Sequence, residues 1–97
     1  MPTYISLLKF TQKGAETIKD GPKRLDSARQ SFKNAGAEIK AWYLLMGEYD
    51  AVTIFDAPSD EVVAKLALTT GMMGSVRTHT MRAFDESDYR KIIASLP

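Results

Sequence analysis

The chain has 97 residues, of which 44% are hydrophobic and 26% charged, a composition typical of one small globular domain spanning residues 1–97. Thirteen basic and twelve acidic residues leave a formal net charge of +1, which gives no electrostatic indication of nucleic-acid or membrane binding. The absence of cysteine excludes disulfides, thiolate nucleophiles and zinc–thiolate sites. Neither a signal peptide nor an apolar run of about 20 residues is recognisable, so we expect a cytoplasmic protein.

The N-terminal part of the chain predicts a strand followed by a helix. Residues 4–10 (YISLLKF) form a short apolar run that is followed by polar residues, as expected for a strand. Asp20 or Gly21 can cap the helix, Pro22 suits its first turn, and Gly36 suits its C-terminal exit.

Two β-rich runs follow, at residues 37–46 and 49–57. Gly47 lies between them and allows a tight connection, so the two runs predict a hairpin. Ser59 then stands where it can cap a second long helix, which we expect to end near Gly71.

The C-terminal part predicts one more strand and one more helix. Residues 75–84 alternate strongly, and Asp85 can cap a short helix whose apolar residues follow the i, i+3, i+4, i+7 rule. The complete order is β-α-β-β-α-β plus a C-terminal helix. This order predicts an α+β, ferredoxin-like fold in which an antiparallel sheet carries both long helices on one side.

Both faces of the predicted sheet are apolar near the hairpin. Trp42 and Leu44 share one face of the second strand, whereas Tyr43 and Leu45 share the other. Helices on one side would leave the second face in water, so another molecule must cover it. A second copy of the chain is the simplest cover, and we therefore predict a homodimer, with assembly beyond the dimer left open.

The sequence also resembles a known family. Its marks in this chain are Pro22-Lys23-Arg24-Leu25, Gly47-Glu48-Tyr49-Asp50, and Val76-Arg77-Thr78 with Ala83-Phe84. In this order they resemble the GYD domain family, small bacterial proteins of the dimeric α/β-barrel class, over roughly residues 4–84. The resemblance implies the fold and a dimer, and it implies no particular reaction.

The Gly-Glu-Tyr-Asp cluster has two interpretations. Gly47 suits a tight turn, and Asp50 can hydrogen-bond nearby backbone amides, which favours a structural role. Glu48 and Tyr49 are less constrained by a turn, so we list them as candidate ligand-binding residues. Trp42 is a third candidate, as the wall of a cavity, although packing in the core or the dimer is the simpler role for the only tryptophan.

The candidate catalytic residues are Arg77, His79 and Asp50. Arg77 could orient an anion or enolate, and either His79 or Asp50 could act as the base. A hydrogen-bonded strand histidine is the more common role for the only histidine, and a multi-histidine metal site is excluded. Arg77 and Arg82 lie on opposite faces of one strand, so at least one of them is expected to pair with a carboxylate if both faces are covered.

These observations lead to two hypotheses. The first is a homodimer that binds a small, partly apolar molecule, either between sheet and helices or between subunits; if it is an enzyme, it would be a cofactor-independent isomerase or monooxygenase. The second is a non-catalytic ligand-sensing or assembly module. Neither hypothesis requires a cofactor, a metal, nucleic acid or a membrane.

Overall fold

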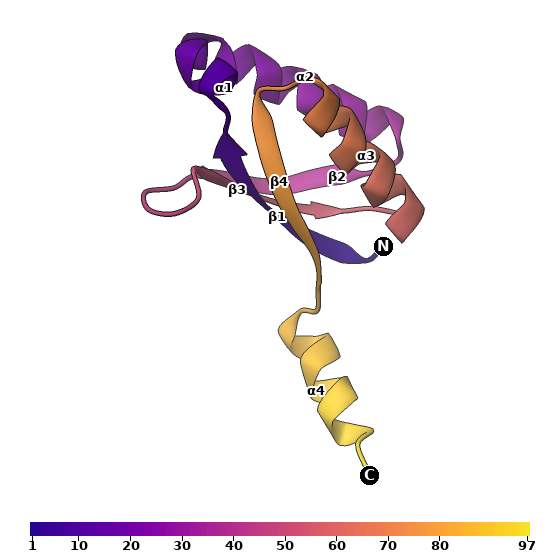
Figure 1. Ribbon diagram of the computed structural model, residues 1–97. Coiled ribbons are helices and arrows are strands. Elements are labelled where there is room, and N and C mark those ends of the chain that lie inside the picture. The colour runs from indigo at the N-terminus through magenta and orange to yellow at the C-terminus, as the bar shows by residue number, and fades with distance from the viewer.

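In a computed structural model that describes all 97 residues, four antiparallel strands form one sheet and two long helices cover one side of it (Figure 1). The strands are β1 (Thr3–Phe10), β2 (Glu38–Leu44), β3 (Ala51–Asp56) and β4 (Val76–Ala83), in the spatial order β2-β3-β1-β4. The long helices are α2 (Gly21–Asn34) and α3 (Asp60–Met72), and α4 (Glu86–Ala94) comes last. The predicted α+β, ferredoxin-like fold with an additional C-terminal helix is confirmed.

Two of the helix caps predicted from the sequence form, at α3 and α4, whereas Asp20, which precedes α2, makes no side-chain capping hydrogen bond. The Ser59 hydroxyl accepts a hydrogen bond from the Val62 N–H at the start of α3, at 3.3 Å, and Asp85 accepts one from the Asp88 N–H at the start of α4, at 2.7 Å. Gly36 follows α2 with φ of +82°, a conformation that glycine adopts at little cost.

Two short helices were not predicted. They are α1 (Gln12–Glu16) and the 3₁₀ turn η1 (Ile18–Asp20), which connect β1 to α2. Elements this short contain too few residues to show a helical period. The visible signal is Thr11, whose hydroxyl accepts a hydrogen bond from the Gly14 N–H and so caps α1.

The hairpin exists, but its strands are shorter than predicted. Residues 45–50 form a loop that closes through a 2.8 Å hydrogen bond from the Leu45 N–H to the Asp50 carbonyl oxygen. Gly47 has φ of +120° in this loop, which confirms its predicted turn role. On β2, a bulge between Ile39 and Ala41 shifts the register against β3.

The hydrophobic core is small and lies between the sheet and the two long helices. The Phe55 ring stacks on Tyr4 at 5.6 Å between centroids and meets Phe32 of α2 edge-on at 5.0 Å. Val63 and Leu66 of α3 complete the contact. Only 11 of the 97 residues are buried, so a single chain hides little apolar surface.

Tyr4 connects this core to the first turn of α3. Its ring is buried, and its hydroxyl donates a hydrogen bond to a carboxylate oxygen of Asp60. That hydrogen bond, and secondly the burial of the ring, raise the pKa of the Tyr4 hydroxyl above its ordinary value. The Arg82 guanidinium, 5.7 Å from the ring centroid, opposes this rise in pKa.

We expect Tyr4→Phe to lower the free energy of unfolding by about 1 kcal/mol at neutral pH, because the Asp60 carboxylate loses a donor. The folded-state pKa of Tyr4 exceeds the unfolded value, so this contribution is complete below about pH 10 and is lost as the pH rises through the folded-state pKa. Urea unfolding of both proteins between pH 7 and pH 11 tests this. A difference in unfolding free energy that stays constant up to pH 11 would contradict it.

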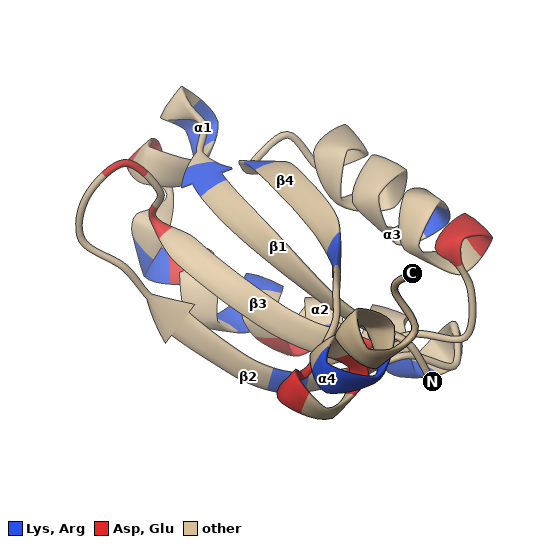
Figure 2. Ribbon diagram, turned by 90° about the horizontal axis from the view of Figure 1, so that it is seen from below, with Lys and Arg blue, Asp and Glu red and all other residues tan.

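The side of the sheet opposite the long helices is apolar and uncovered. We call it the open face, defined by side chains that lie in register across the four strands: Ile5, Leu7, Tyr43, Val52, Ile54 and Met81. Figure 2 looks onto this face and shows that its charged residues gather near the strand ends. Tyr43 is 58% exposed and Met81 37%. The predicted second apolar face is therefore present.

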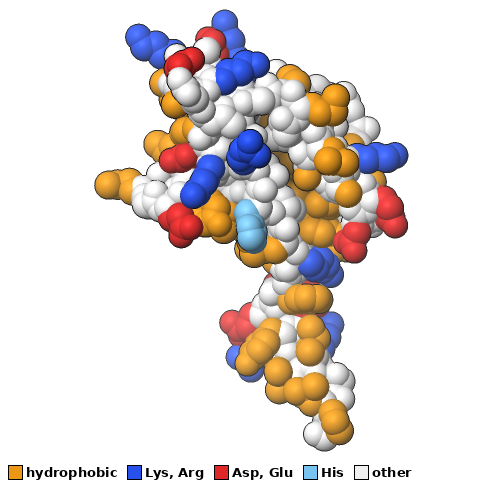
Figure 3. Space-filling model, viewed as in Figure 1, with side chains coloured by type: hydrophobic (Ala, Val, Ile, Leu, Met, Phe, Trp, Pro, Cys, Tyr) orange, Lys and Arg blue, Asp and Glu red, His pale blue; other side chains and the backbone are white.

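Helix α4 points away from the body of the domain, on the side of the sheet opposite α2 and α3 (Figure 1). Figure 3 shows apolar side chains along this arm. Tyr89, Ile92, Ile93 and Leu96, the apolar residues predicted to share one face, are each 43–60% exposed. The arm thus adds apolar surface on the same side as the open face.

The predicted ion pair of Arg77 or Arg82 does not form. Neither guanidinium lies within 4 Å of a carboxylate. Arg82 donates hydrogen bonds to the carbonyl oxygens of Thr3 and Ala83 and lies 4.5 Å from the centre of the Phe84 ring. The prediction assumed that both faces of the strand are covered, whereas β4 is an edge strand on which both arginines are exposed to water.

No helix of the chain is both long enough and apolar enough to cross a membrane.

Candidate binding cavity

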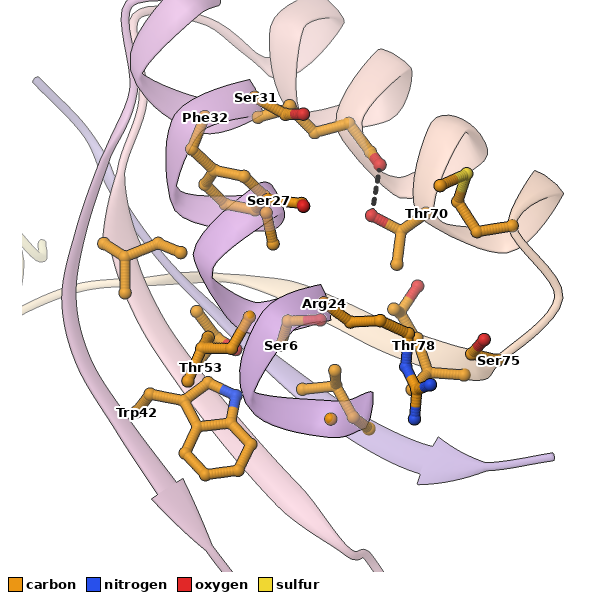
Figure 4. A pocket seen from close by; sticks show the side chains of 18 of the residues that line it. Ser6, Arg24, Ser27, Ser31, Phe32, Trp42, Thr53, Thr70, Ser75 and Thr78 are labelled. Carbon is orange, nitrogen blue, oxygen red and sulfur yellow. Dashed lines mark hydrogen bonds between the residues drawn. The ribbon is translucent and has the colours of Figure 1, made fainter. Parts of the chain in front are cut away.

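A cavity of about 530 Å³ lies between the helix-covered side of the sheet and the helices α2 and α3 (Figure 4). This volume falls within the range of small-molecule sites. Apolar side chains from the sheet and both helices form much of its wall, among them Leu25, Phe32, Trp42, Leu66 and Val76.

The cavity exists because the residues that meet there are small. On the sheet, Ser6, Thr53, Thr78 and Thr80 occupy inward-facing positions of β1, β3 and β4. On the helices, Ala28 of α2 and Ala67 of α3 line the same space. Short side chains on opposing elements leave volume that larger apolar residues would fill in an ordinary core.

Several hydroxyl groups face this cavity without a protein partner. Ser6 and Thr80 bond to each other at 2.9 Å, but Thr53, Ser75 and Thr78 make no side-chain hydrogen bond. Thr53 is only 6% exposed and Ser75 only 7%. Every fully buried polar side-chain atom in the chain has a partner, so the Thr53 and Ser75 hydroxyl oxygens keep some exposed surface, and both residues line the cavity. They are available to bind a ligand.

The charged side chains that line the cavity are Asp20, Lys23 and Arg24, at the start of α2. Arg24 is the one held in place by hydrogen bonds. Its Nη1 lies 3.1 Å from both the carbonyl oxygen and the hydroxyl of Thr17, and its Nη2 lies 3.4 Å from the Gly14 carbonyl oxygen. The short helix α1 and the segment after it thus position a cation at the cavity.

Of the residues predicted from the sequence, only Trp42 lines this cavity. Tyr49 and His79 lie together on the other side of the sheet, with ring centroids 6.3 Å apart and the Lys9 ammonium 5.4 Å from the Tyr49 ring. Arg77 is the register partner of Lys9 on the same face. Figure 3 shows the histidine side chain at the surface of the molecule.

Asp50 and Glu48 also lie outside the cavity. Asp50 takes the predicted structural role: its carboxylate accepts a 2.8 Å hydrogen bond from the Phe10 N–H, and its own N–H donates to the Leu8 carbonyl oxygen. Glu48 is exposed in the loop. Arg77, His79 and Asp50 therefore do not meet in the cavity, and their catalytic role stays a prediction.

The candidate binding and catalytic residues predicted from the sequence include no cavity residue other than Trp42. Arg24 belongs to the Pro22–Leu25 family mark, which by itself indicates no role for it. The hydroxyl residues had a visible signal, because Thr78 and Thr80 alternate with Arg77 and His79 and must share the opposite face. That spacing assigns them a face, but it cannot show that the facing helix positions are alanines.

Comparisons with known proteins agree with this fold. Residues 4–93 match the GYD domain family. A protein of Thermus thermophilus, named glutamine synthetase and cystathionine beta-lyase binding protein, is 35% identical over 89 residues, which are 91% of this chain and 94% of that protein.

Two solved structures share the fold at low sequence identity. The leucine response regulatory protein LrpA of Mycobacterium tuberculosis aligns with a TM-score of 0.56 and 15% identity, over 87% of this chain and 51% of LrpA. This chain thus spans about half of LrpA. The protein TTHA0845 of Thermus thermophilus aligns with a TM-score of 0.51 and 20% identity, over 88% of this chain and 95% of that one.

The family match covers nearly the whole chain, including the three marks singled out in the sequence. With the 35% identity to a relative of almost the same extent, it shows that this chain belongs to the GYD domain family.

Proposed function

We propose that this protein is a non-catalytic binding protein that holds a small, partly apolar molecule in the cavity and acts as a homodimer. The observation that carries the proposal is the cavity itself, with apolar walls and hydroxyl groups that have no protein partner. Such a site stabilises an apolar ligand by burial and orients it through a few hydrogen bonds.

The content of the cavity favours binding over catalysis. A cofactor-independent isomerase or monooxygenase needs a base within hydrogen-bonding reach of its substrate. No histidine lines the cavity, and Asp20 is its only carboxylate. The name of the Thermus thermophilus relative also describes binding rather than a reaction.

Filling the cavity tests the ligand directly. Ala67 of α3 lines the cavity and Ala64, one turn earlier, does not. We expect Ala67→Phe to remove a small molecule that co-purifies with the protein from its host, because the ring takes its space, and Ala64→Phe to retain it. Mass spectrometry of the denatured samples measures this. Equal retention by the two variants would contradict the proposal.

The homodimer is supported by the apolar open face and by α4. A sheet face rich in Ile, Leu and Val is commonly covered by another layer, and isologous pairing with a second copy is the most frequent arrangement of soluble oligomers. Because α4 extends on the side of the open face, its apolar stripe can reach the partner in the same assembly. The dimer would also compensate for the small core of a single chain.

Binding of another protein is a second candidate, and the relative's printed name favours it. In this case the occupied cavity would report the level of a small molecule to a partner protein. Biolayer interferometry with the glutamine synthetase and cystathionine β-lyase of the same host tests the candidate.

We place this role in the cytoplasm, which cell fractionation can check.

A further inference from the structure

We infer that the ligand of the cavity is a small carboxylic acid with an apolar body, and that Arg24 binds its carboxylate. This inference rests on the proposed function and adds the chemical class of the ligand. It comes from the Arg24 guanidinium, which has no counter-ion, and from the Ser75 and Thr78 hydroxyl groups, which make no side-chain hydrogen bond.

The Arg24 guanidinium is a cation without a counter-ion. No carboxylate of the chain lies within 4 Å of it, although Asp20 also lines the cavity. Its protein partners are one hydroxyl and two carbonyl oxygens, which carry no net charge. A partly buried cation of this kind gains most from an anion that enters the cavity.

The hydrogen bonds of Arg24 also leave room for that anion. A guanidinium has five N–H groups, and the three protein acceptors use at most three of them. At least two N–H groups remain free. Two parallel N–H donors match the two oxygens of a carboxylate, which arginine commonly binds in bidentate fashion.

The surroundings of Arg24 select among anions. Figure 4 shows Arg24, Thr78 and Ser75 toward one end of the pocket, and Trp42 toward the other. Two hydroxyls and one guanidinium suffice for a carboxylate. A phosphate, by contrast, would bring a second negative charge. The charged residues of the lining, Asp20, Lys23 and Arg24, together have a net charge of only +1, which matches a single carboxylate. The apolar walls then accommodate a hydrocarbon or aromatic body rather than a sugar or a nucleotide.

The single tryptophan gives a direct test, because Trp42 lines the cavity and reports on it by fluorescence. We would titrate the protein at pH 7.5 with octanoate and 3-phenylpropionate, and with the primary amide of each, below any critical micelle concentration. We expect at least one acid to bind about 10- to 100-fold more tightly than its amide, because a charge-assisted pair forms only with the acid.

Arg24→Gln should remove this preference, because the binding of the acid is weakened far more than the binding of the amide. Lys23→Gln removes a positive charge from the neighbouring residue of the lining, and this variant should retain most of the preference for the acid over the amide. Arg24→Lys should show an intermediate preference, because an ammonium is a point charge without the bidentate edge. Circular dichroism would confirm that each variant is folded.

The outcomes separate this inference from the proposed function. Equal affinity of the wild-type protein for acid and amide would overturn the carboxylate inference and leave the binding role intact, as would a preference that survives in Arg24→Gln. No fluorescence response to any of the four probes would count against both.

Discussion

An Ile54→Glu variant is expected to be a folded monomer under conditions where we expect the wild-type protein to form the proposed dimer. Ile54 lies in the open face on β3, an inner strand, and its register partners are Ile5 on β1 and Ala41 on β2. In a dimer that stacks two open faces, a carboxylate at this position would be buried without a partner. The dissociation constant of the dimer should rise by about 100-fold or more, which analytical ultracentrifugation measures.

Leu68→Glu is the matched control for this variant. Leu68 is 70% exposed on α3, on the helical side of the sheet, so the same change there should leave the dimer intact. Ile54→Thr, which keeps a β-branched side chain, should weaken the dimer to a smaller extent. A dimer of unchanged affinity in the folded Ile54→Glu protein would rule out pairing through the open face.

A Gly14→Ala variant is expected to lose about 3 kcal/mol of unfolding free energy, close to the upper end of what overpacking usually costs. A Cβ atom at Gly14 would lie 2.0 Å from the backbone carbonyl oxygen of Ser75, which cannot move aside as a side chain could. The contact exists because hydrogen bonds from Thr11 to Ser75 and Gly74 hold the start of α1 against the start of β4.

The consequences of Gly14→Ala should extend to the cavity. The Gly14 carbonyl oxygen positions Arg24, and Ser75 lines the cavity, so displacing α1 disturbs both. Gly21→Ala is the control, since no atom lies within 4 Å of the added methyl group and Gly21 already has helical φ. Thermal unfolding should place Gly21→Ala within a few degrees of the wild-type protein. Equal midpoints for the two variants would contradict this account.

Much of the fold could be predicted from the sequence because its signals are local. Ser59 and Asp85 mark helix starts through their own side chains, and Gly36 and Gly47 mark positions that require positive φ. The alternation along β4 likewise assigned its residues to the correct faces. Each of these features depends on residues a few positions apart, which is the range over which sequence patterns are informative.

The cavity could not be predicted in the same way because it depends on distant residues. Thr53, Thr78 and Ala67 belong to three elements, and only their meeting across the core leaves an empty volume. The close contact of Gly14 with Ser75 is also set by tertiary packing, so the sequence indicated only a break after the first strand. The ion pair expected for Arg77 or Arg82, by contrast, was predicted and does not form. The expectation assumed that both faces of β4 are covered, and Arg82 instead donates a hydrogen bond to the Thr3 carbonyl oxygen.

The candidate site chosen from the sequence followed chemically distinctive residues, namely His79, Arg77 and the Gly-Glu-Tyr-Asp cluster. These residues gather near the open face and the hairpin loop, where the proposed dimer contact lies. The cavity instead uses serine, threonine, alanine and one arginine, which are common residues without a distinctive spacing. A binding site of this kind is recognised by the shape of its cavity, which the sequence alone does not indicate.

Native mass spectrometry of the protein purified gently from its host measures the oligomeric state and the content of the cavity in one experiment. We expect a species of twice the 10.8 kDa chain mass that carries a small bound molecule, released as a carboxylic acid on denaturation. A monomer without any adduct, from protein that is folded and sampled at micromolar concentration, would contradict both the dimer and the occupied cavity.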